Sequence, residues 1–152
     1  MKIMSEIIRE KIADGVYFNF IPDNRFKTIR ITASFFRPIT KETASSNALA
    51  ASLITRSFKA YPDLTSLAKK LDELYGAALY STVRKLGEIQ ELRFTVSGID
   101  DKYALDSVKI SKELTELLCS ALFEPTIQEN AFLDSEFAGE RRQLIEELDS
   151  EF

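Results

Sequence analysis

Apolar and polar residues alternate along two stretches near the start of the chain, and this pattern predicts β-strands. Residues 15–21 are aromatic and β-branched and are followed by a Pro-Asp-Asn turn. Residues 26–36 would place one polar and one apolar face on a half-buried antiparallel strand, the apolar positions being Ile29, Ile31, Ala33 and Phe35. We expect the two stretches to pair as a hairpin.

Helical spacing replaces this alternation after Pro38. Thr40 can cap a helix that continues to about Phe58, and the small residues of this segment would let it pack closely under a sheet. A second helix is predicted from Pro62-Asp63 to Gly76, with apolar residues at helical spacing: Leu64, Leu67, Ala68, Leu71 and Leu74.

The second half of the chain repeats the change from strands to helices. Strands are predicted at 77–86 and 89–99, joined by a tight turn at Gly87. A helix at 106–123 follows, with Asp101 or Asp106 as its expected cap, and a Thr126-Ile-Gln-Glu129 capping box is expected to begin a last helix. The inward positions expected for that last helix are Phe132, Phe137, Leu144 and Leu148.

The resulting order, ββααββαα, predicts an α+β fold in which helices pack on one face of a mainly antiparallel sheet. We expect residues 1–152 to form a single, incomplete domain, because the last helix is still running when the sequence ends. The chain would then be the front part of a longer protein.

Composition and charge narrow the possible partners. The 152 residues carry a formal net charge of −4, and the basic residues are scattered among acids. Nucleic acid and membranes are therefore not expected as partners. The chain has one cysteine, Cys119, expected as a buried small apolar residue, and no signal-like apolar segment, so we expect a cytoplasmic protein.

The absence of histidine excludes several chemistries at once. The sequence contains no histidine. It therefore has no imidazole for general base catalysis near neutral pH, for a Ser-His-Asp relay or for zinc. Carboxylate chemistry, lysine chemistry or no chemistry remains.

Three segments, in this order, carry a family resemblance. They are the stretch from Lys59-Ala-Tyr-Pro-Asp-Leu64 to Leu71-Asp-Glu-Leu-Tyr-Gly-Ala77, then Leu122-Phe-Glu-Pro125, and then Glu140-Arg-Arg-Gln-Leu-Ile-Glu-Glu-Leu148. Together they resemble the N-terminal part of the insulinase and mitochondrial-processing-peptidase family, the pitrilysin-like inverzincins. The resemblance covers nearly the whole chain.

In active members, an inverted His-x-x-Glu-His motif on the first helix binds Zn²⁺. Counting back from Pro62, the resemblance places these positions at Ala48, Ala51 and Ser52, so both imidazoles and the base are missing. Glu147 matches the distal ligand, with Glu140 as its upstream acidic neighbour. The resemblance thus implies the fold, while the composition predicts no metal, no cofactor and no peptidase activity.

The family also suggests a role for such a chain. Several members work as pairs in which a subunit without the metal site completes or stabilises an active homologue. The pattern from Tyr61 to Gly76 is most similar to that of non-catalytic bacterial members associated with 5-aminopentanol modification of elongation factor P. The expected partner is an active insulinase-family homologue, in a heterodimer, or a second copy of the chain.

Two other function classes remain open. The strands at 77–99 could offer an edge to an extended peptide or an unfolded protein segment, which would make the chain a stand-alone peptide-binding module. Alternatively, Glu140, Glu146 and Glu147 on one helix could form a carboxylate-based hydrolase site.

Overall fold

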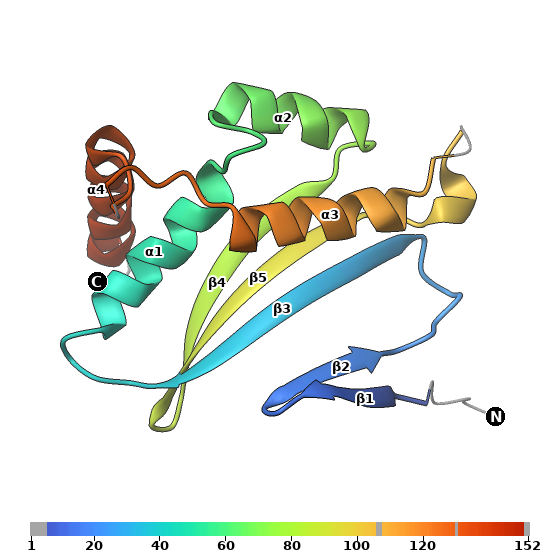
Figure 1. Ribbon diagram of the computed structural model, residues 1–152, viewed down its shortest axis with the longest axis horizontal. Coiled ribbons are helices and arrows are strands. Elements are labelled where there is room, and N and C mark those ends of the chain that lie inside the picture. Colours follow the sequence, from blue (N-terminus) through green and yellow to red (C-terminus); the bar gives the residue numbers. More distant parts are fainter. Residues whose placement is uncertain (1–5, 106–107, 130, 151–152) are drawn as a thin grey trace.

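The computed structural model describes residues 6–105, 108–129 and 131–150, and the side chains of residues 147, 148 and 150 are not described. The fold is α+β with antiparallel sheets, as predicted, and it has one more strand at its start (Figure 1). In chain order the elements are β1 (Ile8–Ala13), β2 (Val16–Phe20), β3 (Thr28–Pro38), α1 (Ala44–Arg56), α2 (Leu64–Glu73), β4 (Ala78–Leu86), β5 (Ile89–Ile99), a 3-10 turn (Asp101–Tyr103), α3 (Ile110–Phe123) and α4 (Asp134–Ser150).

The central sheet has the strand order β3-β5-β4, and both pairings are antiparallel. β4 and β5 form the predicted hairpin, and Gly87 in its turn has a φ of +61°, a value that glycine adopts without steric cost. The register aligns Thr32, Thr95 and Tyr80 across the three strands. Since aligned residues share a face, the middle of the sheet has one apolar face, which carries Ile31, Val96 and Leu79, and one polar face.

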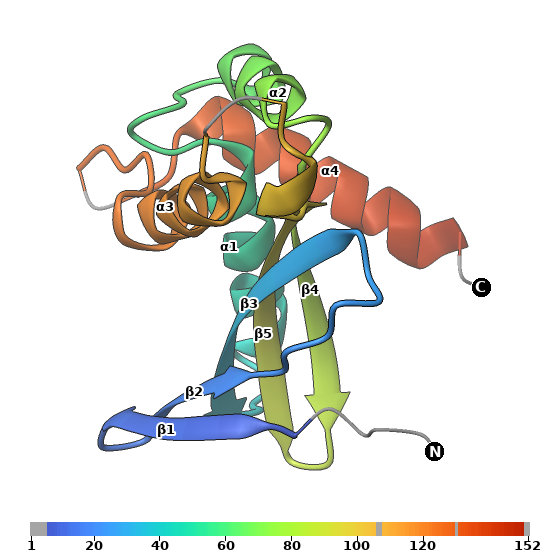
Figure 2. The same cartoon turned by 90° about the vertical axis from the view of Figure 1, so that its right-hand side faces the viewer.

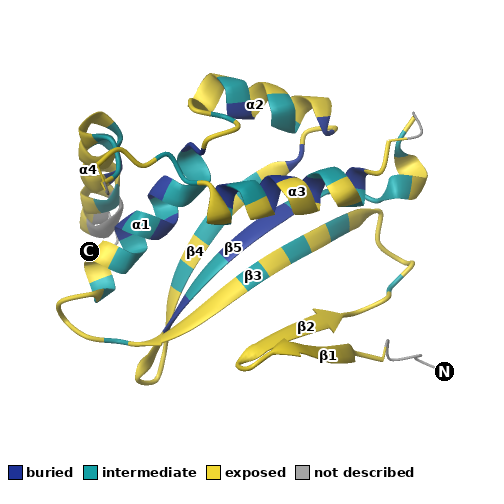
Figure 3. Ribbon diagram, in the orientation of Figure 1, coloured by how far each residue is buried: buried dark blue, intermediate teal, exposed yellow. Residues whose placement is uncertain are grey.

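Helices α1 and α3 cover the apolar face (Figures 1 and 2). Leu114 of α3 and Val96 of β5 are both fully buried, with 0% exposure. α3 has its buried positions at the i, i+3, i+4 and i+7 spacing of one helical face, namely Leu114, Leu117, Leu118 and Ala121. The darkest part of Figure 3 therefore runs along β5 and the facing sides of these helices.

The predicted pairing of residues 15–21 with 26–36 is wrong. β2 pairs with β1 in a separate two-stranded sheet, while β3 pairs with β5. The Asp14-Gly15 turn, with Gly15 at a φ of +73°, closes the β1–β2 hairpin. Both of its strands are exposed along their whole length. β1 was not predicted as a strand because three consecutive charged residues, 9–11, interrupt the alternation of apolar and polar positions.

Three predicted helix starts also differ from the structure, and one of these is α3, which begins at Ile110 instead of residue 106. α1 begins at Ala44, after Thr43, and Thr40 instead holds the preceding turn by accepting a hydrogen bond from the Thr43 amide at 3.2 Å. The Thr126-Glu129 capping box does not form. Glu129 takes a φ of 51° in a turn, so α4 begins only at Asp134.

Other predicted boundaries agree more closely. Asp63 caps α2 through a capping box with Ser66, and Gly76, with a φ of +72°, follows its end. Asp101 accepts hydrogen bonds from the amide and hydroxyl of Ser111, at 2.7 and 2.8 Å, and so caps the start of α3. The alternative cap, Asp106, lies outside the described residues.

Cys119 is exposed, which contradicts the prediction that it is buried. It lies on α3 next to Leu118, which faces the core, so one step along the helix turns the thiol toward solvent. Among the residues that the structure describes, no helix is both long enough and apolar enough to span a membrane.

We expect Leu114→Ala to lower the free energy of unfolding by about 2–5 kcal/mol, because it leaves a cavity between α3 and the sheet. Leu105→Ala is the matched control, since Leu105 is 89% exposed and should lose almost nothing. Urea unfolding followed by circular dichroism measures both. Equal effects of the two substitutions would contradict the described helix–sheet core.

Candidate functional site

Helices α1 and α4 lie side by side, and their facing side chains form a polar network at the positions that the sequence singles out (Figure 1). The Ser52 hydroxyl donates a hydrogen bond to Oε2 of Glu140. These two residues are 88 positions apart in the sequence. The structure therefore brings together two of the predicted site residues, Ser52 and Glu140.

Arg56 completes this network, although it was not among the predicted site residues. Its guanidinium donates to Oε1 of Glu140 and forms an ion pair with that carboxylate. The Glu140 side chain is only 8% exposed and that of Arg56 is 29% exposed. A signal was present in principle, because Arg56 follows Ser52 by four residues, the spacing that puts two side chains on one helical face.

A second contact extends the network by one turn toward the end of α1. The Ser57 hydroxyl donates to Oε2 of Glu136 at 2.9 Å, and Ser57 itself is buried. Glu136 lies four residues before Glu140 on α4, so the two acids share one face. We call these five residues the α1–α4 network: Ser52, Arg56, Ser57, Glu136 and Glu140.

The other predicted site positions are spread over different surroundings. Ala51 is 1% exposed and belongs to the hydrophobic core, while Ala48 is half-buried. Neither side chain carries an atom that could bind a metal. Glu147 lies in α4, but its side chain is outside the described residues.

The α1–α4 network has the chemistry of a structural ion pair. A buried carboxylate that is already neutralised by a guanidinium and held by a hydroxyl has no free charge to offer a cation. Within the described part of the chain, no group of three or more histidine, cysteine, aspartate or glutamate side chains is arranged to hold a metal ion.

The predicted inward residues of the last helix line a groove instead of a closed core. The groove lies between α1 and α4, has a volume of about 470 Å³ and is mainly apolar. Phe137 is 44% exposed there, whereas Phe132 and Leu144 are half-buried. The fourth predicted position, Leu148, has a side chain outside the described residues.

The Tyr61-Pro62 loop of the family-like pattern is firmly attached to the core. Phe58 and Tyr61 exchange two backbone hydrogen bonds, at 3.1 and 2.8 Å, and their rings meet edge to face at 5.4 Å. The Lys59 amide donates to the carbonyl of Glu124 at 2.8 Å. Since Phe58 has 0% exposure, this loop fixes the end of α1 that carries Arg56 and Ser57.

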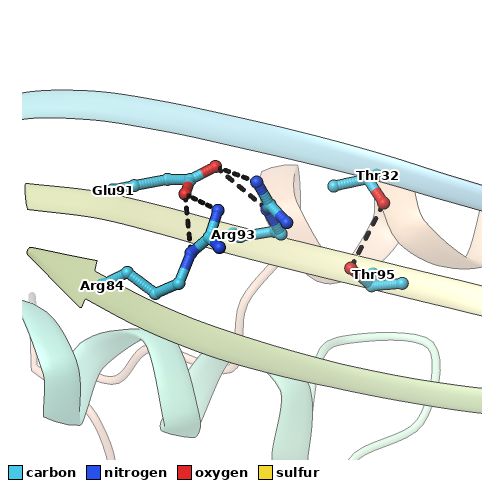
Figure 4. Close-up of polar contacts among 5 residues, drawn as sticks. All are labelled: Thr32, Arg84, Glu91, Arg93 and Thr95. Carbon is cyan, nitrogen blue, oxygen red and sulfur yellow. Dashed lines mark hydrogen bonds and ion pairs between the residues drawn. The ribbon is translucent and has the colours of Figure 1, made fainter. Parts of the chain in front are cut away.

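A second polar cluster, on the sheet, was not predicted. Glu91 of β5 is 1% exposed although it lies on the polar face, because the side chains of Arg84 and Arg93 fold over it (Figure 4). Arg84 donates to Oε2 at 3.1 and 2.6 Å, and Arg93 donates to Oε1 at 2.9 and 2.7 Å. The sequence signal is the cross-strand pairing of Arg84 with Glu91, which requires the register of the hairpin.

Burial alone would raise the pKa of Glu91, but the hydrogen bonds from Arg84 and Arg93 outweigh it and lower that pKa to about 2. The pKa is also lowered for other carboxyl groups, among them Asp101 and Glu113. The backbone amide of Ser111 lowers that of Asp101, and a hydrogen bond from Lys70, at 2.8 Å, lowers that of Glu113. The same bond raises the pKa of Lys70.

The carboxylates proposed for a hydrolase have separate partners. Glu140 is held by Arg56, whereas Glu146 faces solvent and forms an ion pair with Arg142 at 3.8 Å. In the described residues these two glutamates make no contact with each other that would allow them to share a proton.

Comparison with known proteins finds some that resemble the chain. The chain is 27% identical, over 134 residues, to the Bacillus subtilis (strain 168) protein named "Probable inactive metalloprotease YmfF". The match covers 88% of this chain and 32% of that protein. A crystal structure of a conserved protein from Enterococcus faecalis V583 superposes with a TM-score of 0.89 at 28% identity, covering 96% of this chain and 34% of that one. No family model matches the chain.

The chain is therefore similar to an inactive metalloprotease-like protein, and it spans about a third of the length of both relatives.

Breaking the α1–α4 network should loosen α4. We expect Glu140→Gln to lower the free energy of unfolding by about 3 kcal/mol, because it leaves the half-buried guanidinium of Arg56 without its counterion. Glu146→Gln is the control, with an expected loss below about 0.5 kcal/mol, since its ion pair with Arg142 is exposed. Urea unfolding gives both values, and hydrogen exchange of the α4 amides localises the change. A loss for Glu146→Gln as large as that for Glu140→Gln would refute the network.

The lowered pKa of Glu91 also predicts a dependence of stability on pH. Because its pKa falls from 4.5 to about 2 on folding, its contribution is complete above about pH 4.5 and is lost as the pH falls toward 2. We expect wild-type protein to lose roughly 2–3 kcal/mol from this group over that range. Glu91→Gln should remove this part of the acid dependence in urea unfolding measured at several pH values. An unchanged acid slope in that variant would contradict the ionised, buried state.

Proposed function

We propose that this chain is a catalytically silent homologue of the insulinase and mitochondrial-processing-peptidase family, and that it acts as a non-catalytic subunit beside an active zinc peptidase. The observation that carries the proposal is the state of Glu140. Its carboxylate lies against Ser52, the position matched to the second metal-binding histidine, and it is neutralised by Arg56. Arg56 thus neutralises the acidic residue that lies seven positions before the matched ligand position, Glu147, and leaves this carboxylate no free charge beside the altered motif.

The residue types on α1 support the same proposal. Residues 48 and 52 are one helical turn apart, the spacing needed for two metal ligands on one face. In this chain they are alanine and serine, and the position between them that would hold the base is the core residue Ala51. With no histidine anywhere in the sequence, no other register restores the motif.

The partner that we propose is a homologue with an intact His-x-x-Glu-His motif, in a heterodimer, with self-association as the alternative. The relation of the Tyr61–Gly76 pattern to members linked with elongation factor P modification supports a bacterial, cytoplasmic setting for this pair. In such a pair residues 1–152 would form the first lobe of the silent subunit.

We expect the complete protein to contain no stoichiometric zinc and to show no peptide cleavage that chelators abolish. Elemental analysis and a fluorogenic peptide assay measure these two properties. Recovery of a His-x-x-Glu-His homologue with the tagged protein, in the absence of other peptidases, would support the pairing. One zinc ion per chain, or cleavage sensitive to chelators, would overturn the silent state.

Restoring the motif tests the assignment of its positions. We expect the double variant A48H/S52H to bind one Zn²⁺ ion per chain in equilibrium dialysis, because the two imidazoles would lie one turn apart on the same helical face, and Ala51 is kept because it is a core residue. The control A50H/L53H adds two histidines to the adjacent groove face of the same helix and should bind zinc at least about tenfold more weakly. Equal zinc binding by both variants would mean that the motif positions are misassigned.

A peptide-binding module is a second candidate, favoured by the position of β4. This strand lies at the edge of the sheet, pairs with β5 alone among the described strands, and leaves its other side open to backbone hydrogen bonds from an extended peptide. Proline substitution at Thr82 should block such binding, whereas Thr82→Val should preserve it. A screen of unstructured peptides against both variants distinguishes this function from a purely architectural one.

A further inference from the structure

The polar face of the sheet is open and carries an excess of positive charge. We define the arginine face as the side of β3, β5 and β4 on which Arg30, Arg84 and Arg93 lie. On β3 and β4 the positions of this face are exposed, including Arg30, Thr32, Tyr80, Thr82 and Arg84. The helices that contact the sheet cover its other side (Figure 2).

The charge of this face differs from that of the whole chain. Among the strand positions that point to it there are three arginines and one glutamate, Glu91, so positive charge exceeds negative charge by two. The whole chain has a net charge of −4. The basic residues on this face are therefore concentrated against the overall balance, which favours a negatively charged partner at this site.

The guanidinium groups are held in place but are not saturated. Arg84 and Arg93 each use the Nε and Nη2 atoms to bind one oxygen of Glu91, which leaves Nη1 of both groups free among the described contacts (Figure 4). Their side chains are 50% and 36% exposed. Because Glu91 already fixes the orientation of these two arginines, their side chains lose less conformational entropy on binding a carboxylate than freely rotating arginines would.

The spacing of the charges suits an extended chain. Arg30 lies opposite Ser97, four residues beyond Arg93 on β5, which corresponds to roughly 13 Å along the strands. Hydroxyl groups of Thr32 and Thr95, which meet at 3.3 Å, lie between these arginines. Acidic side chains four residues apart on an extended peptide point the same way and span about the same distance.

We propose that the arginine face binds an acidic, extended polypeptide segment, with one carboxylate at Arg84 and Arg93 and a second at Arg30. The Nη1 groups of Arg84 and Arg93 and the exposed guanidinium of Arg30 provide the attraction, and the exposed hydroxyl of Thr32 is available to hydrogen-bond to the peptide backbone. This inference goes beyond the proposed function, because it needs neither a silent metal site nor a homologous partner.

The test measures fluorescence anisotropy of a labelled short peptide with two glutamates four residues apart, titrated with the complete protein. A matched peptide with glutamines in place of both glutamates should bind at least about fivefold more weakly. An increase in salt from about 50 to about 300 mM should lower the affinity for the acidic peptide. Equal binding of the two peptides, or no binding of either, would overturn the proposal.

Variants locate the site. We expect Arg30→Gln to lower the affinity for the acidic peptide about two- to fivefold. Arg84→Lys should lower this affinity by a similar factor while its charge still neutralises Glu91. Arg142→Gln, on α4, makes the same charge change away from the face and should leave binding unchanged. Arg30 is exposed and forms no described ion pair, so circular dichroism of Arg30→Gln should match wild type.

Two further results would refute the proposal. One is a loss of affinity in Arg142→Gln as large as in Arg30→Gln, which would mean a non-specific charge effect. The other is tighter binding of single-stranded DNA of the same charge, which would replace the polypeptide by a nucleic acid. The absence of zinc and of cleavage is measured separately, so failure of either proposal leaves the other standing.

Discussion

Burial of one face of the β3-β5-β4 sheet under α1 and α3 is the constraint on which the rest of the structure depends. It places Val96, Leu114 and Phe58 out of contact with water and, with them, fixes where α1 ends. Only after α1 is held against the sheet can its outer side meet α4. The polar network of Ser52, Arg56 and Glu140 therefore rests on an apolar core that it does not itself form.

Within that frame, an ion pair and a hydroxyl hydrogen bond join α1 to α4. A metal ion and a guanidinium both neutralise a carboxylate, but only the metal activates water. Arg56 neutralises Glu140 and so links α1 to α4. The cost of burying Glu140 is offset by two donors, the Ser52 hydroxyl and the Arg56 guanidinium, that come from a single helix.

The sequence predicts much of this fold because several elements are encoded locally. The alternation of Leu92, Phe94 and Val96 and the glycine at 87 are sufficient to predict the β4–β5 hairpin. The partner of β3 could not be found in this way, since β5 lies more than fifty residues further along the chain. β1 was missed because its charged residues do not alternate with apolar ones in the manner of a half-buried strand.

The candidate site was only partly predictable for the same reason. The spacing from Pro62 points to Ala48, Ala51 and Ser52, but not to what faces them. Arg56 and Ser57 acquire their roles only when α4 is placed, and Glu136 and Glu140 come from a segment about eighty residues later. The burial of Glu91 on a polar face depends on three neighbouring strand positions at once, which no linear pattern records.

The ionised state of Glu91 has a consequence for how the sheet surface responds to its environment. A carboxyl with a pKa of about 2 keeps its charge throughout the physiological range, and the chain has no imidazole that could gain a proton there. A change of pH within the physiological range therefore leaves the charge on the surface of β3, β5 and β4 unchanged. Ionic strength, which screens this charge, is the solution variable that alters its electrostatic potential.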